Sequence, residues 1–392
     1  MTANTTARLH ALDNLRALMM WLGIVLHVAA IHMVRDAPLP WQDGKRAVVA
    51  DLAVAFIHAF RMPVFFILAG FFVAMLLQSR GPAGMARHRA LRLGLPFAVF
   101  WVPVFAATVV LGMLAMHRAI RGTWGLDMRI ADEIVRGPDM PPLPRGPNTM
   151  HMWFLWMLLW MSVATALLAR YVPPAVWRIP ALVLRCLAAA WWGPVVLALA
   201  LLATDAVHPR GMLFPSGSFI PPFTEWAHWA AFFCVGLAMY AVRDELFAIY
   251  LKRWPAFAVA GLVTFFVAGY CVERKVAPQF AYAYGLTAWL WSFAAIGIAL
   301  KWLPSRSAVL AYLADASYWV YLVHLPLTIL FGMGLYLLDL PALVKIALNI
   351  AATTAVCLAS YQLFVRHTWV SVLLNGKRHE RAPRPPAALT PA

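Results

Sequence analysis

Arginine and histidine residues inside long apolar runs are the side chains of this sequence most able to do chemistry. Arg16 and His27 stand eleven residues apart in the run LDNLRALMMWLGIVLH. At 100° per residue their directions differ by about 20°, so they share one helix face, about 16 Å apart along the axis. Arg16 is near the end of the run, where its side chain can equally extend to the surface. His27 is deeper, where it serves either function or a bond to a neighbouring helix.

A second arginine, Arg61, is in the middle of the run DLAVAFIHAFRMPVFFILAGFF. It is about 16 Å from one end of that run, so it needs a partner or a water-filled cavity. Pro63 leaves the carbonyl of Ala59 without its helical donor, which predicts a kink beside Arg61. His58 is one turn away on nearly the same face, and it could serve the site or only the packing.

A third run, YLADASYWVYLVHLPLTILFG, contains His324 two residues before Pro326. Arg61 also precedes a proline by two positions. Tyr321 is one turn before His324 on a similar face. These residues form a second candidate group, on a different helix from His27.

Two further groups stand near the ends of apolar runs. His151 and Trp153 open the run HMWFLWMLLW, where the tryptophan also suits an aromatic belt at a membrane interface. Glu225 and His228 are one turn apart in another run and could line an entrance or form a surface pair.

This set of residues favours acyl transfer among the reactions considered. A desolvated neutral histidine can act as the general base on a hydroxyl, and a fixed arginine can stabilise the oxyanion of a tetrahedral intermediate. Few carboxylates lie deep in the runs, which weighs against a proton-coupled transporter. Histidine and cysteine residues lack metal-ligand spacing, so we predict no metal site. The residues alone leave a transporter or flippase open as an alternative.

The helices that must position these residues are membrane-spanning. The chain has 392 residues, of which 63% are hydrophobic and 12% charged. A soluble domain is nearer half apolar, so soluble enzymes and nucleic-acid binders are excluded despite the net charge of +16. We predict an all-α polytopic membrane protein, because membrane helices need about 20 apolar residues. The ten predicted spans are 15–34, 50–77, 93–116, 151–170, 186–203, 225–242, 255–272, 284–303, 309–336 and 343–365.

Lysine and arginine residues set the predicted orientation. With the N-terminus in the cytoplasm, 18 of the 32 cationic residues lie on the cytoplasmic side and 12 on the other. Both termini are therefore predicted to be cytoplasmic. The segment RGPAGMARHRALR contains Arg87, Arg89 and Arg92, which either set topology or bind an anionic cytosolic ligand such as a nucleotide cofactor.

The domain organisation is simple. We predict one membrane domain over residues 1–374 and a disordered, proline-rich cytoplasmic tail over residues 375–392. The sequence makes no prediction of oligomeric state.

The runs that carry these residues resemble the signatures of the acyltransferase family 3 membrane proteins. The run LDNLRALMMWLGIVLH resembles their first helix, FIHAFRMPVFFILAGFF their second signature, ASYWVYLVHLPL their late-helix signature, and HMWFL a motif opening a central span. Within the family the resemblance is strongest to the osmoregulated periplasmic glucan succinyltransferases. One departure is the single histidine before Leu325 and Pro326, where many members have two.

The resemblance implies an O-acyltransferase in the bacterial inner membrane. Its expected co-substrate is cytosolic acyl-CoA, as succinyl-CoA or acetyl-CoA, with no permanently bound cofactor, and its expected acceptor is a periplasmic glucan. An alternative within the family is O-acetylation of a lipopolysaccharide or exopolysaccharide sugar.

Roles for the candidate residues follow from this implied reaction. We expect His27 to be the base or an acyl-carrying nucleophile, and Arg61 to hold the thioester oxygen or the succinate carboxylate. We expect His324 to orient the acceptor or to shuttle protons. The remaining expectations are donor phosphates on Arg16, Arg87, Arg89 and Arg92, and acceptor contacts on His58, His151, Trp153, Tyr321 and Glu225.

Overall fold

The computed structural model describes residues 3–35, 39, 41–133, 146–208, 211, 213–305 and 307–380, and the regular elements in these ranges are all helical. The all-α prediction is therefore confirmed. The longer helices are α1 (Ala3–Ile31), α2 (Val48–Arg89), α3 (Leu95–Arg121), α4 (Trp153–Tyr171), α7 (Phe223–Ala241), α8 (Arg243–Glu273), α9 (Ala277–Trp302), α10 (Ala308–Tyr336) and α11 (Ala342–Ser360). The shorter elements are α5 (Pro174–Ala189), α6 (Gly193–Asp205), α12 (Trp369–Asn375), η1 (Ala90–Gly94), η2 (Met128–Glu133), η3 (Met150–Met152) and η5 (Tyr361–Val365).

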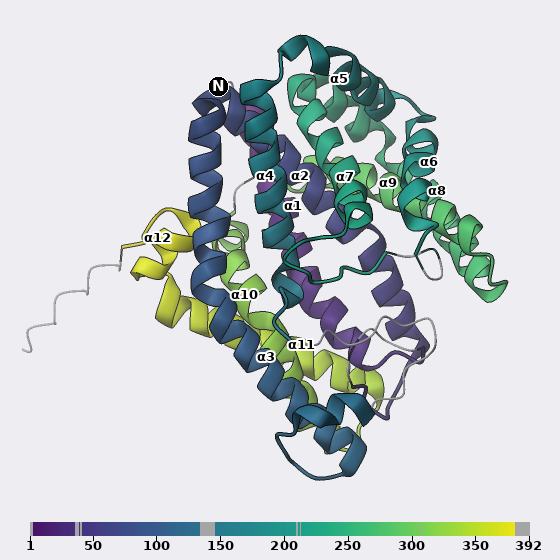
Figure 1. Cartoon of the computed structure of the whole chain (residues 1–392), viewed down its shortest axis with the longest axis vertical. Helices are drawn as coiled ribbons and strands as arrows, with labels where there is room; N and C mark the ends of the chain where they lie inside the picture. The colour runs from purple at the N-terminus through teal and green to yellow at the C-terminus, as the bar shows by residue number, and fades with distance from the viewer. Residues whose placement is uncertain are drawn as a thin grey trace, which may run out of the picture.

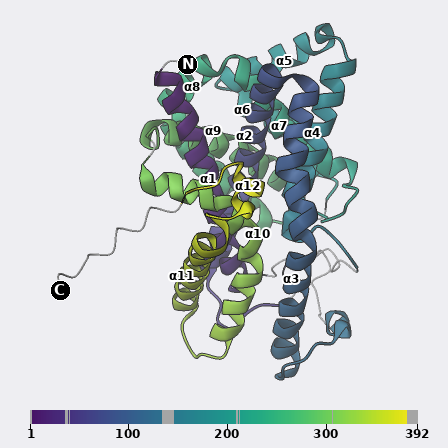
Figure 2. The ribbon, with the colours of Figure 1, turned by 90° about the vertical axis from the view of Figure 1, so that its left-hand side faces the viewer.

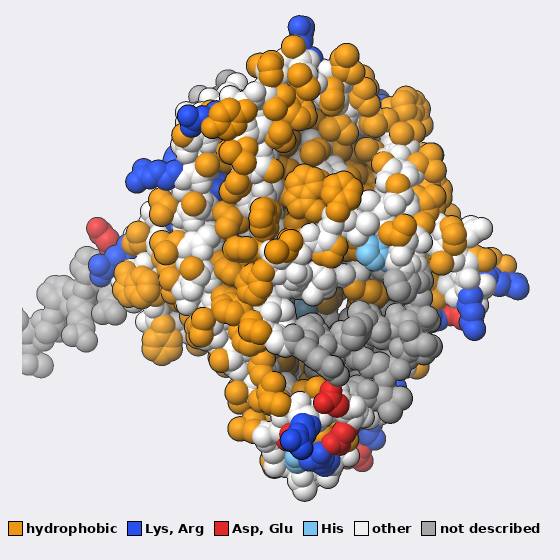
Figure 3. All heavy atoms as spheres, viewed as in Figure 1, with side chains coloured by type: hydrophobic (Ala, Val, Ile, Leu, Met, Phe, Trp, Pro, Cys, Tyr) orange, Lys and Arg blue, Asp and Glu red, His pale blue; other side chains and the backbone are white. Residues whose placement is uncertain are grey.

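The surface and the helix lengths are those of a multi-pass membrane protein. Seven helical runs among the described residues are long and apolar enough to cross a membrane. Apolar side chains cover most of the face seen in Figure 3, and charged side chains gather at its margins. One run, Val48–Arg121, contains both predicted spans 50–77 and 93–116. The chain stays helical between them except at Gly81, whose φ of 67° turns the backbone.

The predicted span 186–203 is not one helix. It breaks at Ala190, which has extended backbone angles, and α6 then begins at Gly193 with Pro194 in its first turn. A 13-residue helix such as α6 is about 20 Å long, short of the roughly 30 Å of a bilayer's hydrocarbon core. The count of ten spans and the orientation of the termini stay predictions.

The C-terminal segment begins with ordered contacts. Nζ of Lys377 is 3.0 Å from a carboxylate oxygen of Asp315, and Nε2 of His379 is 3.1 Å from the other oxygen. Of the predicted tail 375–392, residues 381–392 lie outside the described residues.

Close helix packing brings the residues of the candidate site together. Helix α1 contacts both α2 and α10, and it runs through the centre of the molecule in Figure 1. Helices α2 and α7 cross where Gly70 and Gly236 face backbone: a Cβ on either would lie 2.0 Å from a carbonyl oxygen. Small residues at such crossings let membrane helices approach closely. The long axes of α3 and α4 run side by side in Figures 1 and 2.

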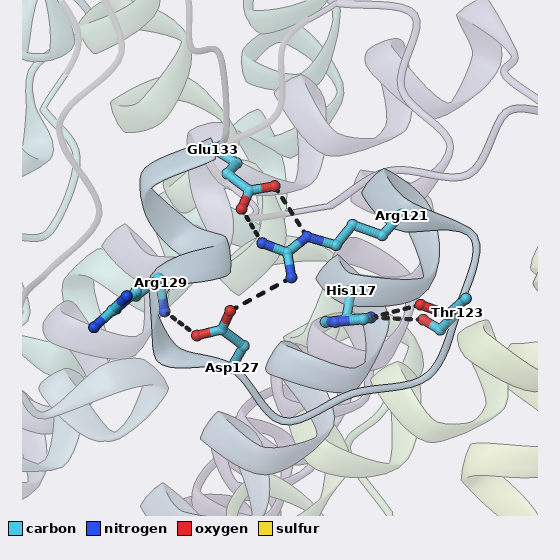
Figure 4. Close-up of polar contacts among 6 residues, drawn as sticks. All are labelled: His117, Arg121, Thr123, Asp127, Arg129 and Glu133. Carbon is cyan, nitrogen blue, oxygen red and sulfur yellow. Dashed lines mark hydrogen bonds and ion pairs between the residues drawn. The ribbon is translucent and has the colours of Figure 1, made fainter.

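The two ends of the bundle differ in their residues. We call the end that holds residues 80–94 the basic end, and the end that holds η2 the cavity end, for the cavity described below. At the cavity end, Arg121 pairs with Glu133 and lies 3.5 Å from Asp127 (Figure 4). His117 bonds through Nδ1 to the carbonyl oxygen of Thr123 at 2.8 Å, which closes the turn after α3.

Candidate active site

Three helices bring His27, Arg61 and His324 into one site. The ring centroids of His27 on α1 and His324 on α10 are 5.2 Å apart. A Cβ built on Gly23 of α1 would lie 2.5 Å from Nη2 of Arg61 and 3.5 Å from Nε2 of His324. The absence of a side chain at Gly23 therefore makes room for the guanidinium of Arg61 beside both histidines.

Arg61 is buried and held by backbone. Its Nε donates to the carbonyl oxygen of Met19 on α1 at 2.8 Å, and the side chain is 7% exposed. Within the described residues, no carboxylate lies within ion-pair distance of it. A buried cation without a counter-ion is costly, so the site is suited to receive negative charge from a bound molecule.

His324 presents an unprotonated nitrogen. Its Nδ1 lies 2.8 Å from the carbonyl oxygen of Tyr321 and 3.0 Å from that of Val320. A carbonyl oxygen only accepts, so Nδ1 carries the hydrogen and Nε2 of the neutral ring carries a lone pair. This Nε2 is buried without a hydrogen-bond partner among the described residues. It is the nitrogen that faces Gly23 and Arg61, so it is available to a substrate hydroxyl.

Pro326 explains how His151 joins the group. Proline has no N–H, so the carbonyl of Leu322, four residues earlier, loses its helical donor. That carbonyl instead accepts from Nε2 of His151 at 3.2 Å. The hydroxyl of Tyr321 donates to the carbonyl oxygen of His151 at 2.8 Å, which ties η3 to α10 a second time.

His151 has the same kind of unpaired nitrogen as His324. Because Nε2 of His151 donates, its Nδ1 carries the lone pair, and this atom is also buried without a partner in the described part of the chain. The ring centroids of His151 and His324 are 5.3 Å apart and nearly perpendicular. The site therefore contains two neutral imidazoles with free acceptor nitrogens, next to one buried guanidinium.

A large cavity connects this group to the cavity end. Its volume is about 2280 Å³. The lining includes Arg61 at the site and also Arg35 and Glu273. Arg35, just after α1, forms an exposed ion pair with Glu273 at the end of α8. The sequence-predicted residues that line it are His27, His58, Arg61, His151, Trp153, Glu225, Tyr321 and His324. The structure thus brings together all the predicted catalytic and acceptor-binding residues.

Glu225 and His228 are not a pair, although they are one turn apart. The Glu225 carboxylate accepts from the backbone N–H of Ser216 at 3.0 Å and from its hydroxyl at 2.8 Å. His228 instead lies 2.6 Å from Asp205 at the end of α6. The open alternative of a surface pair is therefore wrong, and Glu225 holds the wall segment around Ser216.

The four arginines predicted to bind the donor lie apart from the cavity. None of them is in its lining within the described residues. Arg16 is 3.3 Å from Asp13, Arg87 is exposed, and Arg92 donates to the carbonyls of Val372 and Leu373. Arg89 differs, because its Nε and Nη2 are buried without a partner among the described residues.

Sequence reasoning missed two residues that shape the site. Gly23 provides the space for Arg61, and Met19 provides its acceptor. The sequence did contain a signal for Gly23, because this glycine lies one turn before His27 on the same helix face. The backbone role of Met19 has no signature in its side chain.

The fold and the site define a polytopic membrane protein with a buried histidine–arginine centre. A family model described as an acyltransferase domain (Acyl_transf_3) matches residues 9–362. The chain therefore belongs to acyltransferase family 3, and it is a membrane acyltransferase. The family resemblance predicted from its motifs is confirmed.

Similar proteins share one description. Glucans biosynthesis protein C of Salmonella gallinarum is 22% identical over 404 residues, covering 96% of this chain and 97% of its own length. The proteins of the same description from Salmonella typhi and Salmonella typhimurium are also 22% identical, with the same coverage. No solved structure matches this chain.

Proposed function

We propose that this protein transfers a succinyl group from cytosolic succinyl-CoA to hydroxyls of a periplasmic glucan, as a multi-pass enzyme of a bacterial inner membrane. The observation that carries the proposal is the convergence of His27, Arg61 and His324 at the inner end of one cavity. The similarity to glucan biosynthesis proteins over nearly the whole chain supports the choice of acceptor.

The proposed chemistry needs a base and an oxyanion stabiliser. His27 takes the proton of the acceptor hydroxyl while its oxygen attacks the thioester carbonyl. The negative charge on the carbonyl oxygen falls beside the Arg61 guanidinium. The tetrahedral intermediate then collapses: its C–S bond breaks and the new C–O bond of the ester is kept. The proton passes from His27 to the departing thiolate. A two-step route, in which His27 first carries the acyl group, uses the same residues.

His324 and His151 are suited to bind the acceptor. Both offer buried lone-pair nitrogens, to which hydroxyls of the sugar other than the reacting one can donate, and these bonds would orient the sugar so that the reacting hydroxyl faces His27. The same cavity is lined by His58, Trp153, Tyr321 and Glu225, and the glucan is proposed to arrive through its cavity end. An aromatic face such as that of Trp153 suits the apolar side of a sugar ring.

The donor is proposed to approach from the basic end. Its phosphates would lie among Arg16, Arg87, Arg89 and Arg92, since guanidinium groups bind phosphate in a bidentate way. Arg89 is the strongest candidate for a phosphate contact, because two of its nitrogens are buried and have no partner among the described residues. The cavity does not extend to these residues, so delivery of the acyl arm along α1 needs an opening between the basic end and His27.

The test is a transfer assay on the purified full chain in liposomes. Succinyl-CoA and acetyl-CoA are supplied in turn with a glucan acceptor, and mass spectrometry identifies the ester formed. Succinylated glucan supports the proposal. Acetylated product alone assigns the enzyme to O-acetylation, and flux of glucan or acyl-CoA across the membrane without consumption of acyl-CoA makes it a transporter.

A further inference from the structure

A second, smaller cavity lies behind the wall of the first. Its volume is about 30 Å³, and its lining includes Asp205, His228 and Tyr284. His58 and Tyr284 each line both cavities, so these two side chains form part of the wall between them. A space of this size holds about one water molecule, and its lining offers the two or more polar partners that a buried water needs.

Asp205 and His228 form a buried carboxylate–imidazole pair at this cavity. Nδ1 of His228 lies 2.6 Å from Oδ1 of Asp205, and the side chains are 12% and 7% exposed. The carboxylate also accepts from the hydroxyl of Thr204 at 3.2 Å. A carboxylate on Nδ1 holds the imidazole in the tautomer whose Nε2 is an acceptor, so His228 can receive a hydrogen bond from water.

Tyr284 limits the ways in which His58 can be held. The Tyr284 hydroxyl donates to the carbonyl oxygen of Ala55 at 2.9 Å, so toward His58 it can only accept. Nδ1 of His58 lies 3.5 Å from that hydroxyl, which is a long contact for a hydrogen bond. This contact alone holds the ring weakly, and a second partner is needed to fix its orientation toward the main cavity.

We propose that Asp205 and His228 are positioning residues for the acceptor: a water in the small cavity joins His228 to His58 and fixes the His58 ring toward the glucan. The inference rests on the proposed function, because it gives the pair a role in binding the glucan. The alternative is a purely structural link between α6 and α7. The two differ in kinetics, since a positioning role affects acceptor KM and a structural role affects folding.

The experiment compares His228→Phe, His228→Gln and His117→Phe in the full chain, reconstituted in liposomes. His117→Phe is the matched control, because His117 also bonds through Nδ1 to an oxygen but lines neither cavity. His228→Phe is expected to raise the KM for glucan about tenfold, the effect of losing one orienting hydrogen bond. Its kcat and its KM for acyl-CoA stay within about twofold of the wild type. His228→Gln, which keeps an acceptor, restores most of the loss, and His117→Phe changes neither constant.

A double variant tests whether the effect passes through His58. If it does, His58→Phe/His228→Phe has the same acceptor KM as His58→Phe alone, because the second change has nothing left to orient. Multiplied effects, or an unchanged KM in His228→Phe, would overturn the inference. Asp205→Asn provides the same test if His228→Phe does not fold, with a rise in KM of about threefold expected and an unchanged KM overturning it.

The wild type separates this inference from the proposed function. A wild-type protein that transfers no acyl group to glucan contradicts the proposed function and the inference with it. A wild-type protein that is active, with His228 variants that bind glucan normally, contradicts only the inference.

Discussion

Two buried polar clusters in this protein differ in whether their polar atoms are paired. At the candidate active site, Arg61 has no carboxylate partner, and Nε2 of His324 has no hydrogen-bond partner, within the described residues. In the other cluster, Nζ of Lys345 on α11 lies 2.8 Å from Asp43, with both side chains at most 3% exposed. The second oxygen of Asp43 accepts the backbone N–H of Lys45 at 2.7 Å.

The difference is the one expected between a cluster that binds a ligand and a cluster that only stabilises the fold. A paired buried ion gains nothing from a ligand, whereas an unpaired one is stabilised when a ligand brings charge or a donor. The Asp43–Lys345 pair clamps the segment after α1 to α11, and the neighbouring Asn349 is also satisfied, by Thr328 and Thr353. Changes in the first cluster should therefore affect activity, and changes in the second should affect stability.

The largest expected effect is on catalysis. His27→Ala is expected to lower kcat by about a thousandfold, within the range for loss of a general base. The variant should keep its melting temperature, since its ring borders the cavity. The transfer assay measures kcat, with His117→Ala as the control that keeps activity. Full activity in a correctly inserted His27→Ala protein would remove His27 from the mechanism.

The next effect is on stability. Lys345→Met leaves the Asp43 carboxylate buried and unpaired, so the protein should lose about 3–5 kcal/mol of unfolding free energy. Thermal unfolding in detergent measures the loss. The double variant Lys345→Met/Asp43→Leu should recover much of it, and activity per folded molecule should stay near that of the wild type. A stable but inactive Lys345→Met protein would contradict the division between the two clusters.

A smaller effect on activity is expected from Pro326, which frees a backbone carbonyl to bind a side chain of the site. Pro326→Ala supplies an N–H that can bond the carbonyl of Leu322, in competition with His151. We expect the KM for glucan to rise about tenfold with stability unchanged or raised, because His151 loses its anchor. Pro103→Ala, at an exposed proline inside α3, is the matched control. An unchanged KM for glucan in Pro326→Ala would show that the freed carbonyl has no role.

Substitution of Arg89 at the basic end should change only the binding of the donor. Arg89→Gln is expected to raise the KM for acyl-CoA about fivefold through loss of a charge-assisted bond to phosphate. The KM for glucan should not change. Arg80→Gln, in the same basic segment, is the control. Equal changes in both KM values would contradict a donor site at Arg89.

The smallest effect is expected at an exposed ion pair. Nζ of Lys45 lies 2.7 Å from Asp339, and this contact holds the pKa of the Asp339 carboxyl below its usual range. The aspartate side chain is 90% exposed, so solvent screens the pair. Asp339→Asn should leave the melting temperature and kcat unchanged. A clear loss of stability would contradict the expectation that an ion pair stabilises this fold only where it is buried.

Sequence patterns predicted most of the site because helix periodicity and depth are local properties. The depth of His27 and of Arg61 in their apolar runs and the proline after His324 can each be recognised along one helix. The shared face of Arg16 and His27 did not place Arg16 at the cavity. The prediction of one continuous helix over 186–203 was wrong for a related reason. Apolar composition continues through Trp191 and Trp192, while the break depends on backbone angles at Ala190 that composition does not encode.

The amino-acid sequence by itself determined the membrane class, the family and the identity of the candidate site residues. Only the tertiary structure decided which of them meet and which atoms remain unpaired. Pairing depends on contacts between helices far apart in the chain, such as Arg61 with the carbonyl of Met19 and His151 with that of Leu322. The same is true of Asp205 and His228, since a carboxylate and an imidazole 23 residues apart become partners only when α6 packs against α7.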